Sequence, residues 1–282
     1  LSMDETDGVQ KFHFTPTPRI GGIPVVLGLW VVMIWGGANL DYHAGRGQVA
    51  QLLWDLLIAS LPAFVFGLLE DVTKRVGVMT RLLATMASGV FAWWLTGTAL
   101  ARVDVWGLDL LLASWWPLSV AFTAFAVGGV ANALNIVDGF NGLASSTAFW
   151  ACVGYALMAI RVNDPSMAVV CLTLAATMLG FFVINWPFGK LFLGDGGSYF
   201  TGFALAWLAV LLVERHPQIS AFAVLVVLAY PVTEVLFTMF RRKSRQDHLG
   251  HPDRLHFHSL FKRRYVARWF KGYDATVRNS IA

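Results

Sequence analysis

The chain of 282 residues carries a formal net charge of +4, and 57% of its residues are hydrophobic while only 13% are charged. Because soluble domains carry about one quarter charged residues, this composition excludes an ordinary soluble domain and indicates a polytopic membrane protein. The two cysteines, Cys152 and Cys171, both fall inside apolar runs. That placement favours small packing residues over a disulfide framework or a zinc site.

Eight apolar segments approach the roughly 20 residues that a membrane-spanning helix needs. They cover residues 21–40, 50–69, 80–100, 115–134, 143–160, 167–184, 198–213 and 219–240. Lipid does not tolerate irregular backbone, so all eight are expected to be helices. The sequence therefore predicts an all-α polytopic integral membrane protein with about eight transmembrane helices. We expect one transmembrane domain over residues 1–282, in which residues 241–282 form a basic, histidine-containing segment.

The loops between these segments differ in charge according to the side on which they lie. The motif side, as we call it, comprises residues 1–20, 70–81, 135–142, 185–197 and 241–282. It holds all of the 21 Lys and Arg except Arg46, Arg102, Arg161 and Arg215. The positive-inside rule therefore predicts that the motif side is cytoplasmic, although much of the excess comes from the residues after 240.

The first two polar motifs lie before and after the first pair of apolar segments. The stretch "PTPRIGG" at residues 16–22 is either a rigid entry turn or a place where Arg19 reaches a phosphate. The stretch "LLEDVTK" places Glu70 and Asp71 within one helical turn of Lys74. It is either a solvated helix end or a base or metal site that faces a phosphate.

The third motif, "NALNIVDGFNG" at residues 132–142, follows directly after a long apolar run. Asn132, Asn135 and Asp138 are three residues apart, so they line one face of the last helical turns. Gly139 can supply a left-handed helix stop, and Asn141 opens the next helix. A cap needs only one polar residue, and carboxamides offer donors and acceptors that suit a base or a sugar.

The fourth motif, "LGDGGSYF", surrounds Asp195 with glycines. Ser198 can cap the next helix, and a glycine-rich turn such as Gly194 at a helix start exposes N–H groups that favour phosphate. Asp195 is placed to hold a hard cation such as Mg²⁺ together with substrate phosphates.

The last motif is the basic run that contains Arg254, His256 and His258. It is either a strip on anionic lipid headgroups or a set of groups that binds a diphosphate, and it lacks the ligands of a zinc site. Glu234, inside the last apolar segment, is expected to face the protein interior because ionisable groups are expensive in lipid.

Together, these motifs in this order resemble the polyprenyl-phosphate N-acetylhexosamine-1-phosphate transferases of glycosyl transferase family 4. The resemblance covers nearly the whole chain. Three departures mark this chain: Glu70 replaces an Asp, Asn141 replaces an Asp, and "RLHFHS" replaces a run of three histidines. The last of them indicates the undecaprenyl-phosphate GlcNAc-1-phosphate transferase-like branch rather than the peptidoglycan translocase branch. Since the family has ten or eleven helices, the resemblance also implies that this chain is a fragment.

The resemblance implies transfer of N-acetylhexosamine-1-phosphate from a UDP-sugar to a membrane polyprenyl phosphate, with release of UMP, at the start of a cell-surface glycan such as O-antigen lipopolysaccharide. Mg²⁺, with Mn²⁺ as the alternative, is the implied cofactor, and no nucleic acid is an expected partner. The implied location is the bacterial inner membrane with a cytoplasmic site, and a homodimer is left open.

The resemblance also assigns roles. Catalytic roles fall to Glu70, Asp71, Lys74, Asp138 and Asp195, and metal binding to Asp195 and Asn135. Substrate binding falls to Arg19, Asn132, Asn135, Asn141, Gly194, Ser198, Arg254, His256 and His258.

Two other classes of protein remain as alternatives, a transporter and a non-catalytic membrane scaffold. A transporter is expected to place polar residues near the membrane midplane and to show inverted repeats, whereas the polar motifs here gather on one side. A scaffold leaves the four polar residues between Asn132 and Asn141 without an explanation.

Overall fold

The computed structural model describes residues 3–4, 17–36, 48–245, 256–273 and 275–281, which are almost entirely helical. Two short strands, β1 (Met3–Asp4) and β2 (Thr17–Pro18), pair in antiparallel fashion. The helices before the loop at residues 138–142 are α1 (Gly22–Val31), η1 (Val32–Gly36), α3 (Gln48–Ala59), α4 (Leu61–Thr73), α5 (Val78–Thr96), α6 (Leu108–Ser114) and α7 (Trp116–Val137). The helices after it are α8 (Leu143–Arg161), α9 (Pro165–Asn185), α10 (Gly194–Arg215), α11 (Ala221–Val227), α12 (Ala229–Arg245), α13 (Phe257–Phe261), η2 (Lys262–Val266), α14 (Ala267–Trp269) and α15 (Ala275–Ile281).

The described residues of the eight apolar segments expected from the sequence are mostly helical, which confirms the all-α polytopic class. Five helices of the described chain, α5, α7, α8, α9 and α10, are long and apolar enough to cross a membrane, and seven spans result if two bent pairs count as one each. The pair α3 and α4 bends by 47°, and the pair α11 and α12 bends by 84°. The first segment forms a shorter apolar helix, Gly22–Trp35.

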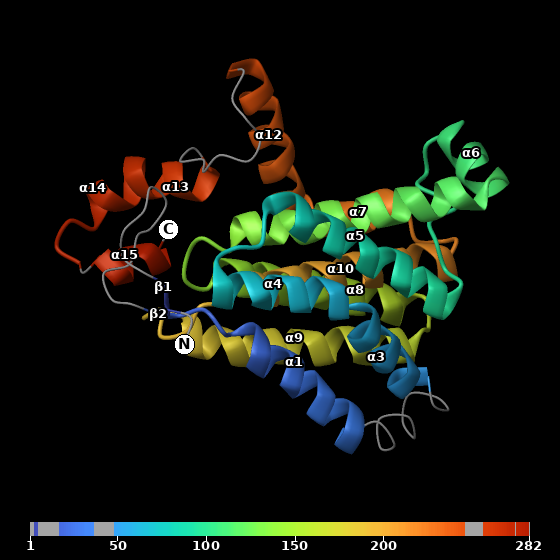
Figure 1. Cartoon of the computed structure of the whole chain (residues 1–282), viewed down its shortest axis with the longest axis horizontal. Coiled ribbons are helices and arrows are strands. Elements are labelled where there is room, and N and C mark those ends of the chain that lie inside the picture. Colours follow the sequence, from blue (N-terminus) through green and yellow to red (C-terminus); the bar gives the residue numbers. More distant parts are fainter. Residues whose placement is uncertain (1–2, 5–16, 37–47, 246–255, 274, 282) are drawn as a thin grey trace.

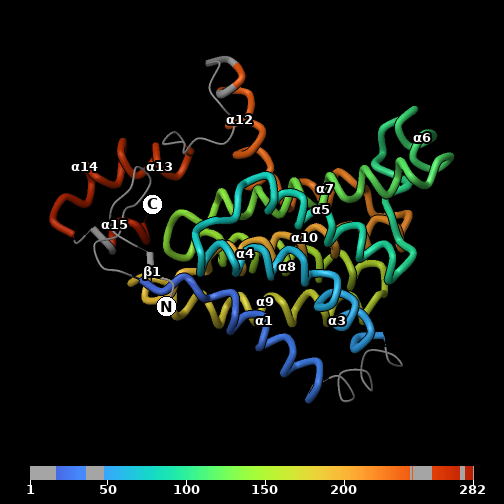
Figure 2. Tube along the Cα trace, viewed as in Figure 1, coloured from blue at the N-terminus to red at the C-terminus, as the bar shows by residue number. Residues whose placement is uncertain are grey.

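The expectation of about eight transmembrane helices therefore needs refinement at the last segment, which is a bent pair of helices. The break lies between Val227 and Ala229, and Pro231 follows in the first turn of α12. Proline has no N–H and fits the first turn of a helix, so it favours a new helix start at this point. Figure 2 shows that α12 leaves the bundle sideways instead of continuing along it.

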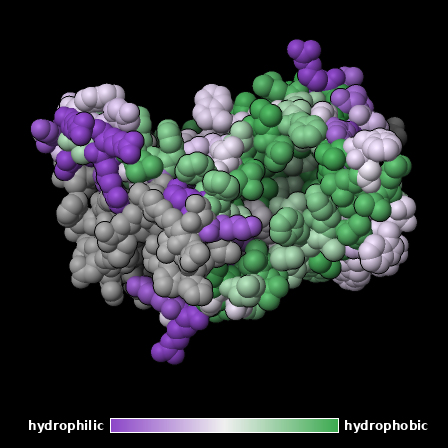
Figure 3. All heavy atoms as spheres, turned by 90° about the horizontal axis from the view of Figure 1, so that it is seen from above, coloured by the Kyte–Doolittle hydropathy of each residue, from purple (hydrophilic) through white to green (hydrophobic). Residues whose placement is uncertain are grey.

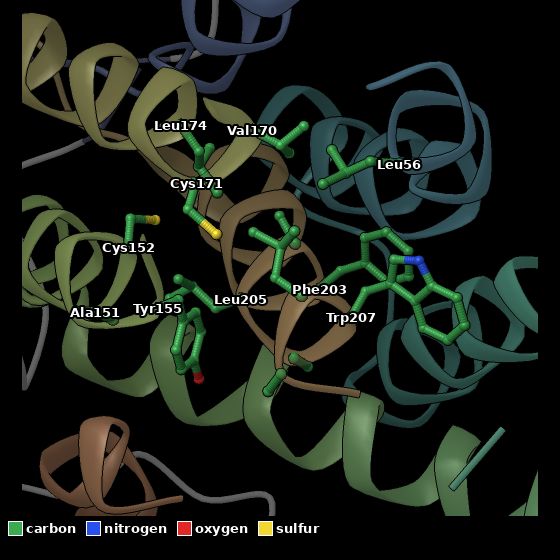
Figure 4. Packing of buried hydrophobic residues seen from close by; sticks show 14 of the residues in the cluster. Leu56, Ala151, Cys152, Tyr155, Val170, Cys171, Leu174, Phe203, Leu205 and Trp207 are labelled. Carbon is green, nitrogen blue, oxygen red and sulfur yellow. The ribbon is translucent and has the colours of Figure 1, made fainter. Parts of the chain in front are cut away.

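Helix α10 is the centre of the bundle, and its whole apolar window is buried within the protein. It contacts α1, α4, α5, α7, α8, α9 and α11. Its side chains Phe203, Leu205 and Trp207 lie among residues of the surrounding helices, such as Leu56 and Cys171 (Figure 4). A helix that is apolar all round is buried on every face, as α10 is here.

The outer helices present apolar side chains to the surroundings. Large exposed side chains include Phe125 and Trp150, which are 66% and 67% exposed. In Figure 3 the visible face is hydrophobic over most of the bundle, and hydrophilic residues gather mainly at the end that carries α13 and α14. Lipid covers such a surface without cost, so the protein is a multi-pass membrane protein.

The described parts of the motif side come together at one end of the bundle. The end of α4, the loop from α7 to α8, the start of α10 and the helices α13 to α15 all lie at this end, while α6 lies at the other (Figure 1). The alternation of loops read from the sequence is therefore confirmed by the arrangement of the helices.

Candidate active site

Asp195 lies in the first turn of the central helix α10 and is the group on which the polar motifs converge. Asp195 is buried, with 6% of its surface exposed. Arg19 donates from Nη2 to Oδ1 of Asp195 at 3.1 Å, and Asn135 donates from Nδ2 to the same oxygen at 3.0 Å. Arg81 pairs with Oδ2 of Asp195 through Nη1. Residues from three separate motifs and one further helix thus meet at a single carboxylate.

Asp71 holds the start of α10 in place. Its carboxylate accepts the backbone N–H of Asp195 at 2.9 Å and that of Gly196 at 2.8 Å. The first four N–H groups of a helix have no partner within the helix, and Asp71, which is 1% exposed, satisfies two of them from α4. Arg19 Nε lies 3.5 Å from Asp71 Oδ1 and offsets part of the negative charge.

Gly194 makes this close approach possible. Its φ of +74° lies in the left-handed region, which side chains other than glycine disfavour. A Cβ at this position would lie 2.4 Å from Arg19 O and 2.6 Å from Asp71 Oδ2. The glycine expected to open a phosphate-binding turn therefore also allows Asp71 and Arg19 to reach the helix start.

Two local expectations for this region are wrong. Ser198 does not cap the helix, because α10 begins four residues earlier, at Gly194. Its hydroxyl instead accepts from Asn135 Nδ2 at 2.8 Å and donates to Asp195 O at 3.3 Å. Gly139 is not the left-handed stop of α7; the left-handed glycine of that loop is Gly142, with φ of +80°.

The three polar residues at the end of α7 do not share one environment. Asn132 donates to Gly128 O at 2.8 Å within its own helix and to Thr85 Oγ1 at 3.4 Å on α5, whereas Asn135 joins Asp195. Asp138 ends α7 and is partly exposed. Its neighbourhood includes Arg19, Asp195 and Asp71, so the carboxyl faces the same site.

The surroundings of Asp138 favour a proton on it when no cation is near. Burial among protein atoms raises the pKa of Asp138 well above its usual range, and the charges of Asp195 and Asp71 act in the same direction. Arg19 and the backbone N–H of Gly194 oppose the rise. A cation placed among these carboxyls would act in the opposite direction and lower this pKa.

Glu70 and Lys74 lie at the exposed edge of this site. Glu70 is half-buried and accepts the backbone N–H of Val76 at 2.7 Å. Lys74 is exposed and ends α4 in the left-handed conformation, with φ of +53°. The two adjacent acids therefore differ in kind, since Asp71 is buried against the backbone of α10 and Glu70 is not.

Asn141 contacts a different part of the motif side. Its Nδ2 donates to Pro187 O at 3.2 Å and to Ser280 Oγ at 3.1 Å. These contacts tie the loop from α7 to α8 to the loop after α9 and to α15, and neither of them reaches Asp195.

The two histidines of the last motif are buried beside that same loop. His256 and His258 are 8% and 4% exposed, and their rings stack at 5.4 Å. The His258 ring meets Phe140 edge-on at 4.9 Å, and a Cβ on Gly139 would lie 3.3 Å from His258 Nε2. Burial and the neighbouring His256 lower the pKa of His258 to about 4, against a smaller opposing effect of Glu234. Arg254 lies outside the described residues.

The donor chemistry of the site suits a hard cation, but the protein alone does not form a cage. Asp71, Asp138 and Asp195 supply the oxygen ligands that Mg²⁺ prefers. Within the described residues, no three His, Cys, Asp or Glu side chains group closely enough to hold a metal ion. Asp71 is occupied by backbone N–H groups and Asp195 by two arginines. One or two carboxylates together with substrate phosphates are the usual Mg²⁺ ligands, so the residues fit a cation that arrives with a diphosphate.

Arg81 and Tyr199 belong to the site although the motifs did not point to them. Arg81 lies in the first turn of α5, and its guanidinium is 6.0 Å from the centre of the Tyr199 ring on α10. Arg81 Nε is buried and has no hydrogen-bond partner in the described structure. A charged residue just inside an apolar segment was the available signal, because such residues are expensive in lipid and face protein or ligand.

The fold and the site define a multi-pass membrane protein with a charged site at one end of its helical bundle. Residues 53–213, more than half of the chain, match the family model of glycosyl transferase family 4. The chain belongs to this family, which confirms the expectation from the motifs.

Three relatives illustrate the similarity. The chain is 27% identical over 268 residues to an undecaprenyl-phosphate alpha-N-acetylglucosaminyl 1-phosphate transferase of Escherichia coli (strain K12), which covers 90% of this chain and 67% of that protein. It is 22% identical over 253 residues to a Bacillus subtilis (strain 168) protein named "Probable undecaprenyl-phosphate N-acetylglucosaminyl 1-phosphate transferase", covering 88% and 66%. It is 26% identical over 257 residues to a phospho-N-acetylmuramoyl-pentapeptide-transferase of Lactiplantibacillus plantarum, covering 86% and 75%.

The chain thus spans about two thirds to three quarters of the length of these relatives. Relatives of both branches match at similar identity, so the assignment to the GlcNAc-1-phosphate branch stays a prediction.

Proposed function

We propose that the protein transfers an N-acetylhexosamine-1-phosphate from a UDP-sugar to a polyprenyl phosphate in the membrane. The observation that supports this most directly is the cluster around Asp195. Two arginines, one asparagine and three carboxyls lie at the same end of an apolar bundle, where a water-soluble diphosphate and a lipid phosphate can meet. The names of the relatives point to the same acceptor, undecaprenyl phosphate.

The proposed step is a phosphoryl displacement. An oxygen of the polyprenyl phosphate forms a bond to the β-phosphorus of the UDP-sugar, and the bond from that phosphorus to the bridging oxygen breaks. UMP leaves with the electron pair, and the sugar remains on a polyprenyl diphosphate. The nucleophile is already an anion, so the protein's task is to align two negatively charged groups and to neutralise charge that develops on the leaving phosphate.

The residues around Asp195 suit this task. Arg81 has an unused buried donor at Nε, and Arg19 reaches the site from the segment before α1. Both present the planar guanidinium that matches phosphate oxygens in pairs. Lys74, exposed at the rim, is placed to meet the phosphate of the lipid acceptor, and Glu70 beside it is the accessible acid of the pair.

The donor nucleotide and sugar would lie along the end of α7 and the loop that follows it. Asn135 and Asp138 offer polar groups for this contact, and Gly194 and Ser198 lie beside them at the start of α10. We assign Asn132 and Asn141 to the donor as well, although their bonds go to Thr85 and to Pro187 and Ser280 rather than to the group around Asp195. His258 borders the loop at Gly139 and stacks on His256, while Arg254, which the sequence motif adds to them, lies outside the described residues. We assign the diphosphate or the sugar to these residues.

Asp195 would hold Mg²⁺, with Asn135 and Asp138 as neighbouring oxygen donors, and Mn²⁺ is the alternative ion. When bound with the donor, the cation supplies neutralisation of the diphosphate charge. Without it, Arg19 and Arg81 pair with Asp195. We infer that these arginines shift to the substrate phosphates when the cation takes their place at the carboxylate.

We also propose that the motif side faces the cytoplasm of a bacterium across the inner membrane, because the basic loops lie there. UDP-sugars would then reach the site from the cytoplasm. The expected product begins a surface glycan such as O-antigen lipopolysaccharide, and a homodimer is compatible with the exposed apolar surface.

The test is a transfer assay with the full chain in membranes. Membranes that contain the protein are incubated with Mg²⁺, undecaprenyl phosphate and either UDP-GlcNAc or UDP-GalNAc. UMP release and the extracted lipid product are both measured, and membranes with Asp195→Asn serve as the matched control. UMP release that depends on the acceptor lipid and disappears in the control supports the proposal. Uptake of a solute without UMP release would identify a transporter instead. The absence of both UMP release and uptake would favour a scaffold.

A further inference from the structure

Helix α12 carries a stripe of polar side chains that faces the buried histidines. Tyr230, Glu234 and Thr238 are four residues apart, so they lie on one face of the helix. Glu234 and Thr238 are 6% and 4% exposed. Helix α12 leaves the bundle sideways (Figure 1), and all three side chains hydrogen-bond to the His256 or His258 ring that packs against it.

Glu234 makes the strongest of these contacts. Its Oε1 lies 2.9 Å from His256 Nδ1, and its carboxylate also accepts the backbone N–H of Phe257, at 3.0 Å through Oε1 and at 3.2 Å through Oε2. Thr238 Oγ1 lies 3.4 Å from the same His256 nitrogen. An ionised carboxylate can only accept, so Nδ1 of His256 carries a proton that points at Glu234. In the neutral form of the ring, Nε2 is therefore the nitrogen with the lone pair.

The contacts pass from His256 to the loop after α7. The His256 ring stacks on His258, Tyr230 OH lies 3.2 Å from His258 Nδ1, and His258 Nε2 faces Gly139. Gly139 follows Asp138 directly. The Phe257 N–H that Glu234 accepts is also the first N–H of α13, so Glu234 fixes both the ring and the helix that carries it.

We propose that Glu234 is a positioning residue for the transfer reaction. It sets which nitrogen of His256 carries the proton and holds His258 against the loop at residues 138–140. Partners of this kind fix the tautomer and orientation of a functional histidine in other sites. The proposal rests on the proposed function, because positioning matters for turnover only if these histidines border the substrates.

The experiment compares the full-length wild-type chain with Glu234→Gln, and Thr233→Val is the matched control. Gln keeps the size of Glu, but its amide can present either a donor or an acceptor to Nδ1. Thr233 is exposed, and its hydroxyl bonds only to its own helix, at Ala229 O and Tyr230 O. Histidine ¹⁵N NMR reports the ring protonation, UMP release reports turnover, and melting temperature reports folding.

In Glu234→Gln we expect loss of the pure Nδ1–H signature of His256 and a fall in turnover of about 10-fold or more. Thr233→Val is expected to match the wild type in both. Adding Glu234→Gln to His256→Ala is expected to cause little further loss, because the Gln oxygen can still accept the N–H of Phe257 and the contact that is lost is the one to the His256 ring. A folded Glu234→Gln with unchanged turnover and ring signals overturns the proposal, and so does a double variant whose losses add fully.

Failure of the proposed function and failure of the variant to fold can each be distinguished from failure of the positioning proposal. If wild-type membranes release no UMP, the proposed function fails, and the NMR comparison alone then supports or overturns the positioning of His256. If Glu234→Gln does not fold, Glu234→Asp replaces it. The Asp side chain is shorter by one methylene, so its carboxylate lies farther from His256 Nδ1. Mixed ring protonation with reduced turnover then supports the proposal, and unchanged values for both overturn it.

Discussion

At the scale of single residues, Asp195 carries more of the site than any other group, because Arg19, Arg81 and Asn135 all direct donors at its two oxygens. We expect Asp195→Asn to lower turnover by at least about 10²-fold, since a neutral amide binds a hard cation much more weakly than a carboxylate and no longer forms ion pairs with two arginines. The measurement is UMP release per folded protein. Asp109→Asn is the matched control at the other end of the bundle, where Asp109 accepts the N–H of Val103. Near wild-type turnover in Asp195→Asn would remove this carboxylate from the reaction.

Arg81 is the second residue whose replacement is expected to lower turnover. Arg81→Met keeps the length of the side chain but removes the charge, so we expect a loss of turnover of about 10²-fold. Arg81→Lys keeps the charge without the planar fork and should recover only part of the activity. Arg161→Met, at the exposed end of α8 on the other side, is the control. Equal activity of Arg81→Met and this control would show that Arg81 only balances Asp195.

At the scale of elements, the start of α10 depends on a carboxylate from α4. In Asp71→Asn, one of the two backbone N–H groups of residues 195 and 196 meets an amide N–H₂ instead of an acceptor. A buried donor without a partner costs about 1–3 kcal/mol, so a lower melting temperature is expected. Glu70→Gln is the comparison, because Glu70 is less buried and bonds only the N–H of Val76.

If Asp71 serves only to hold α10, turnover per folded molecule in Asp71→Asn should fall little. If it also contacts the lipid phosphate, turnover should fall by more than the loss of folded protein explains. Melting temperature and UMP release on the same preparation distinguish these roles. An unchanged melting temperature would contradict the structural role that its two backbone contacts indicate.

At the scale of the whole molecule, the arrangement of loops predicts how the protein lies in the membrane. Thr73 on the motif side and Ser114 on the other are both exposed, whereas the native Cys152 and Cys171 are buried. With Thr73→Cys and Ser114→Cys in intact inner-membrane preparations, an impermeant thiol reagent should reach residue 114 from the periplasmic face. It should reach residue 73 only after permeabilisation. The reverse pattern would place the site on the outer face and exclude a cytoplasmic donor.

Much of the architecture was predictable because hydrocarbon limits what a chain can do. Every apolar segment had to become a helix, and successive helices had to alternate direction, which brought the motif-side loops to one end. The meeting of Arg19, Asn135 and Asp195 follows the same logic, since each lies at the same end of its segment. The sequence by itself therefore determined the helical class, the shared end and most candidate residues.

The tertiary structure decided which side chains meet, because rotation and packing of each helix set the direction of its side chains. Only packing shows that Arg81 reaches Asp195, that Asp71 serves the backbone of α10 while Glu70 stays at the rim, and that Asn132 turns to α5. The 84° bend after α11 is likewise a property of the assembled bundle. Contacts between residues far apart in the chain, such as Glu234 with His256 or Asp71 with Gly196, cannot be inferred from the residue periodicity of a single helix. They arise where two helices bury polar groups together, since a buried polar group must find its partner wherever the fold supplies one.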